Sequence, residues 1–119
     1  MPNDPATETS NPIEALEEAY RLAHAAYRKA RFDPQASDET VQRLGRLLNG
    51  CRDALTAAIV AGLRNSTAQV TGATAALVAA NQRIDEILKG LDRTTDIIDA
   101  VDQALGLAVG IVRLVTPAP

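Results

Sequence analysis

Residues 63–112 read LRNSTAQVTGATAALVAANQRIDEILKGLDRTTDIIDAVDQALGLAVGIV, with a large aliphatic side chain at every seventh position. These positions are Leu63, Val70, Leu77, Ile84, Leu91, Ile98, Leu105 and Val112. A repeat of this length lines one side of an α-helix and predicts contact with another helix. Between the aliphatics stand mostly small residues: Ser66, Ala73, Ala80, Ile87, Thr94, Val101 and Ala108. Large residues that alternate with small ones favour close antiparallel packing over a parallel leucine zipper.

Two helix starts precede this stretch. Asn11 can cap a helix that begins with Pro12, and Ser37 can cap a second one. The first helix is expected to end near residue 32, because Asp33 precedes a proline and is disfavoured in the helical conformation. We therefore predict a first helix over about 12–32 and a second from about 38.

The remaining helix breaks decide between two architectures. The spacing Leu55–Ile59–Leu63 is a stutter in the repeat and indicates a turn near residues 62–67. Across Gly90 the seven-residue spacing continues, which favours one helix from about 67 to 115. This predicts an all-α antiparallel helical hairpin or coiled coil with an additional N-terminal helix, a bundle-like arrangement of three to four helices. A second break at Gly90 would give a compact four-helix bundle over 12–32, 38–64, 67–89 and 92–115.

The chain has 119 residues, a length that suits one domain. We expect a disordered leader over 1–10, a single helical domain over 11–116 and a short tail over 117–119. The first eighteen residues hold no Lys or Arg and do not resemble a signal peptide, so a cytoplasmic location is expected. The net charge of −3 argues against nucleic acid as a partner. Abundant Ala, with Arg preferred to Lys, is typical of GC-rich bacterial genomes.

Residues that could carry catalysis are scarce. His24 is the only histidine and Cys51 the only cysteine, so no nucleophile–base arrangement can be assembled. Asp92, Asp96 and Asp99 share one helical face, but neither a glycine turn nor a histidine accompanies them as in known metal sites. We expect a solvated acidic face, no cofactor, no metal and no enzymatic activity.

Two stretches stand out for binding. Residues 65–82 carry no charge, and small residues recur at Ala68, Gly72, Ala76 and Ala80, which suits close helix contact. Residues 104–112 are apolar on every side, which indicates burial in a bundle or oligomer. At nine residues this stretch is too short to span a membrane. The predicted interaction residues are Leu63, Val70, Gly72, Ala76, Leu77, Ala80, Ile84, Leu91, Ile98, Leu105, Gly106, Val109, Gly110 and Val112.

The sequence therefore predicts a helical interaction protein of adaptor, immunity or structural accessory type. It is expected to bind a protein partner or to form a homo-oligomer. Its Ala/Thr-rich long helices resemble those of bacterial phasins and of small accessory or immunity proteins of secretion systems, although no motif carries a residue over. The alternative is an amphipathic protein, pore-forming or phasin-like, that uses residues 97–115 for peripheral contact with a membrane or another hydrophobic surface.

Overall fold

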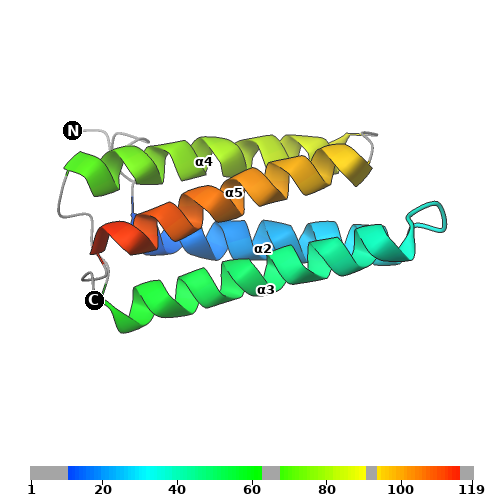
Figure 1. Ribbon diagram of the computed structural model, residues 1–119. Helices are drawn as coiled ribbons and strands as arrows, with labels where there is room; N and C mark the ends of the chain where they lie inside the picture. Colours follow the sequence, from blue (N-terminus) through cyan, green and yellow to red (C-terminus); the bar gives the residue numbers. More distant parts are fainter. Residues whose placement is uncertain (1–10, 63–67, 91–93, 116–119) are drawn as a thin grey trace.

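The computed structural model describes residues 11–62, 68–90 and 94–115, which form four α-helices in a bundle (Figure 1). Their bounds are α2 Pro12–Arg31, α3 Asp38–Val60, α4 Ala68–Lys89 and α5 Thr94–Val115. The fold is thus all-α and bundle-like, as predicted. The four-helix division, which the sequence left as the second alternative, is the one observed.

The first two helices begin at the predicted capping residues. The side-chain oxygen of Asn11 accepts from the backbone nitrogens of Ile13 and Glu14, at 2.9 and 3.3 Å. The hydroxyl of Ser37 accepts from the backbone nitrogen of Thr40 at 3.1 Å. These bonds satisfy amide groups that have no partner within the helix, and so fix where each helix starts.

The end of α3 lies close to the predicted turn. The helix ends at Val60, four residues before the bound of 64 in the four-helix alternative, and Gly62, within the predicted turn at 62–67, follows with a φ of 65°. Glycine adopts this left-handed conformation without steric cost, so it suits the end of a helix. Leu63 and Leu91 of the repeat lie outside the described residues.

The helices form two antiparallel hairpins, α2–α3 and α4–α5, which pack side by side (Figure 1). Between the hairpins α2 lies beside α4, and α3 lies beside α5, each pair running in the same direction. In contrast, α3 and α4 sit on a diagonal and barely touch, although they are consecutive in sequence.

The prediction of one helix from 67 to 115 is wrong. Helix α4 ends at Lys89, and α5, which begins at Thr94, runs antiparallel to it (Figure 1). The core-facing side also shifts: α4 buries Leu77 and Ile84 of the repeat, whereas α5 buries Ile98 but leaves Leu105 half-buried. The seven-residue spacing continues through the sequence, but α4 and α5 are separate helices, so each can rotate about its own axis to bury a different side.

Alanine dominates the side of α2 that faces the core. The helix buries Ala15, Ala19, Ala23, Ala26 and Ala30, with Leu16 and Leu22 beside them. Small side chains let neighbouring backbones come close. On α4, Asn81 reaches across and donates from its amide nitrogen to the backbone oxygen of Ala15 over 3.0 Å.

Candidate interaction surfaces

Most of the predicted aliphatic residues belong to the core of the chain itself. Val70, Leu77, Ile84 and Ile98 are buried inside the bundle, and Leu105 and Val112 are half-buried against it. A charged residue at Leu77 or Ile84 would therefore test folding and could not report on a partner. The surfaces open to a partner lie elsewhere.

The small-residue stretch of α4 is largely exposed. Gly72, Ala75, Ala76 and Ala79 face solvent, whereas Ala80 is buried. A Cβ built on Gly72 would have no atom within 4 Å, so no neighbouring helix requires a glycine at this position. Of the small residues at 68, 72, 76 and 80, only Ala80 therefore packs inside the bundle.

The apolar end of α5 is split between the core and the surface. Ala104, Ala108 and Ile111 are buried, Val109 is half-buried, and Gly106 and Gly110 are exposed. Cβ atoms on the two glycines would also meet nothing within 4 Å. Leu114, one turn further on, leaves 45% of its surface in solvent.

Together these residues form one surface. Because α4 and α5 are antiparallel neighbours, the first half of α4 lies beside the last half of α5 (Figure 1). Residues 68–82 and 103–112 contain no charged side chain. We call the exposed small residues of these ranges, with Leu114 beyond Arg113 at their edge, the uncharged face: Gly72, Ala75, Ala76, Ala79, Gly106, Gly110 and Leu114.

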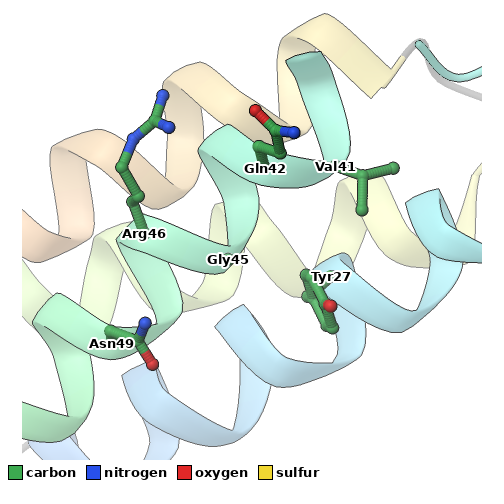
Figure 2. Close-up of a pocket in the computed structure, with 6 residues that line it drawn as sticks. All are labelled: Tyr27, Val41, Gln42, Gly45, Arg46 and Asn49. Atoms are coloured by element: carbon green, nitrogen blue, oxygen red, sulfur yellow. The ribbon is translucent and has the colours of Figure 1, made fainter. Parts of the chain in front are cut away.

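A second surface, which the sequence did not reveal, lies on the opposite hairpin. A shallow pocket of about 350 Å³ opens between α2 and α3. Its lining is Tyr27, Val41, Gln42, Gly45, Arg46 and Asn49, here called the hairpin pocket. Figure 2 shows the ring of Tyr27 projecting from α2 toward Gly45, with the other side chains arranged along α3.

Gly45 allows this approach. A Cβ at this position would lie 3.3 Å from Cε1 of Tyr27, which is closer than most real contacts of that kind. The pairing of residue 27 with residue 45 also sets the antiparallel register, so segment 20–32 lies along segment 40–52. These two segments hold Arg21, Arg28, Lys29, Arg31, Arg43, Arg46 and Arg52 and no carboxylate, although Asp33, Glu39 and Asp53 adjoin their ends. Arg21 pairs with Glu18 and Arg52 with Asp53, at 2.7 and 3.8 Å. The sequence signal for this surface is the basic run 28–31 with Arg43 and Arg46 on the next helix.

The groups considered for chemistry lie apart. His24 is exposed on α2, and Cys51 is buried on α3, where desolvation raises the pKa of the thiol to about 11. The exposed Asp96 and Asp99 stand on α5, and Asp92 lies outside the described ranges. Within those ranges no three His, Cys, Asp or Glu side chains gather as metal ligands would.

Protein-family models, curated proteins and solved structures gave no match to this chain. Among the helices in the described ranges, none is both long enough and apolar enough to cross a membrane.

Proposed function

We propose that this chain is a non-enzymatic interaction protein that works through helix–helix packing and self-associates through the uncharged face. The observation that carries the proposal is the exposure of small, uncharged residues on two neighbouring helices. Gly72 and Ala76 of α4, together with Gly110 of α5, stand at its centre.

The chemistry of this face suits a second copy of the same chain. Glycine and alanine let two helix backbones approach closely, so dispersion contacts form along the whole helix. In a two-fold dimer each face meets itself, and charged residues would then oppose like charges. The uncharged face avoids that repulsion, and Leu114 at its edge supplies apolar area.

The alternative function, adsorption to a membrane or another hydrophobic surface through residues 97–115, draws less support from the fold. The large side chains that would enter such a surface include Ile97, Val101 and Ile111, and all three are buried in the bundle. Adsorption would require α5 to leave its neighbours. Flotation with liposomes tests this function, since it requires binding that Val109→Asp abolishes.

Sedimentation equilibrium tests the self-association directly. The wild-type chain is expected to show a mass above 12.6 kDa that rises with concentration. Ala76→Glu should sediment as a monomer, because it places a charge at the centre of the face on an exposed helical position. Thr56→Glu, on an exposed position of α3, is the matched control and should associate as the wild type does.

Two outcomes would overturn the proposal. A wild-type mass of 12.6 kDa at the highest concentration reached would remove self-association altogether. Association of Ala76→Glu at wild-type strength would place the contact on another surface. Circular dichroism of both variants should match the wild type, which excludes unfolding as the cause of any change.

A further inference from the structure

We infer that the hairpin pocket is a docking site for an acidic amphipathic helix of a partner protein, with one apolar side chain of that helix seated in the pocket. This surface lies on α2 and α3, whereas the uncharged face lies on α4 and α5. The inference therefore stands independently of self-association.

The lining of the pocket suits a side chain as its occupant. The aromatic ring of Tyr27 and the methyl groups of Val41 provide apolar contact, and Gly45, which carries no side chain, lets the ring lie against α3. Arg46 and Asn49 add polar groups to the lining, and Figure 2 shows the guanidinium of Arg46 extending away from Tyr27. Tyrosine and arginine around one depression are the residue types that dominate binding energy in protein interfaces.

The apolar surface continues beyond the pocket in both helices. Half-buried Ile13 and Tyr20 precede Tyr27 on α2 at seven-residue intervals. On α3, Leu48 and Leu55 follow Val41 at the same interval. An extended line of this kind matches the side chains that a helix presents on one face, so it favours a helix over a small compact ligand.

The charge around the pocket determines the chemistry of the partner. Arg28, Arg31, Arg43 and Arg46 are exposed, and none of them forms an ion pair with a residue in the described ranges. Asp38 and Glu39 lie in the first turn of α3, at the same end of the hairpin. Acids and bases are balanced over residues 11–62, with seven of each. The unpaired arginines gather around the pocket, where residues 27–49 hold five bases and three acids. Such a surface attracts and orients an acidic partner.

A nucleic acid is the competing polyanion, and the observations favour it less. Phosphate groups would use the same arginines, but they would leave the apolar line from Ile13 to Tyr27 without a partner. The net negative charge of the whole chain also opposes a long polyanion. An acidic helix over the pocket end satisfies both the arginines and the apolar side chains of Tyr27 and Val41, whereas Glu14, Glu17 and Glu18 flank the line near Ile13.

The test uses the full chain and three synthetic helical peptides. The first carries Leu on one face and Glu elsewhere, the second replaces Glu by Lys, and the third replaces Leu by Ser. Titration followed by ¹⁵N–¹H spectra is expected to shift the amide signal of Gly45 with the first peptide alone. Arg46→Glu should weaken that binding about tenfold or more. Arg83→Glu, an exposed position on α4, should leave it unchanged.

Three results would overturn the inference. Equal binding of the peptide without Leu would show charge attraction with no use of the pocket. Tighter binding of a single-stranded oligonucleotide at the same ionic strength would identify a nucleic-acid surface instead. Shifts confined to α4 and α5, or no shift at millimolar peptide, would exclude the hairpin as the docking site.

Discussion

Leu105 of α5 occupies the space that a side chain on Gly50 of α3 would need. A Cβ built on Gly50 would lie 2.8 Å from Cδ2 of Leu105 and 3.1 Å from Cδ1. Gly50 therefore sets how closely the two parallel neighbours α3 and α5 approach. The glycines at 72, 106 and 110 have no such contact, so the same residue type has different roles on the two hairpins.

This difference predicts opposite effects for two glycine-to-alanine substitutions. Gly72→Ala should raise the free energy of unfolding by about 0.5–1 kcal/mol, because alanine favours the helix and meets no neighbour. Gly50→Ala gains the same propensity but displaces Leu105, and crowding of this kind costs about 1–3 kcal/mol. In urea unfolding of the dilute monomer, the midpoint of Gly72→Ala should lie above that of the wild type, and the midpoint of Gly50→Ala should lie below it. Equal midpoints for the two variants would contradict the close packing of α3 on α5.

Thr74→Val is expected to stabilise the fold. The side chain of Thr74 is fully buried on α4, and the hydroxyl oxygen has no hydrogen-bond partner among the residues that the structure describes. Thr74→Val keeps the shape and removes the unpaired polar group, so it should stabilise the fold by about 1 kcal/mol. Thr56→Val on the exposed side of α3 should change stability by less than about 0.5 kcal/mol. A destabilised Thr74→Val variant would show that the hydroxyl has a partner after all.

The sequence predicted the helical elements well because their signals are local. Asn11 and Ser37 are capping residues, and the structure shows both caps. The connection at Gly90 was misjudged because regular spacing carries no information on whether the helix continues. Ile84 and Ile98 both face the core, yet they do so from two antiparallel helices.

The surfaces were harder to predict because they depend on contacts between distant residues. The sequence marked Gly72 and Gly110 as small residues, but only the pairing of α4 with α5 places them on one exposed side. The hairpin pocket requires Tyr27 to meet Gly45, which in turn requires the register of α2 on α3. Neither residue is distinctive alone.

Asn81→Asp is expected to lower the free energy of unfolding, and acid should reverse part of this loss. The amide nitrogen of Asn81 donates to the backbone oxygen of Ala15, and the residue is 4% exposed. In Asn81→Asp a buried carboxylate would face that oxygen, and an unpaired buried charge costs about 3–5 kcal/mol. Protonation restores a donor, so the deficit relative to the wild type should shrink as the pH falls toward about 4. Gln82→Glu, exposed on the same helix, should show little deficit at pH 7. A deficit that does not change with pH would contradict this role of Asn81.

The buried thiol of Cys51 should make the wild-type fold less stable at high pH. Burial raises the pKa of its thiol from 9.0 to about 11, so the folded chain holds a proton that the unfolded chain releases above pH 9. The contribution of the neutral thiol is therefore complete below pH 9 and is lost progressively as the pH rises toward 11. Urea midpoints of the wild type should fall more steeply over this interval than those of Cys51→Ala, in which the other basic groups still titrate. Parallel curves would show that the thiol is hydrated in the folded chain. Slow reaction of the native thiol with iodoacetamide at pH 8, and fast reaction in urea, would support the same burial independently.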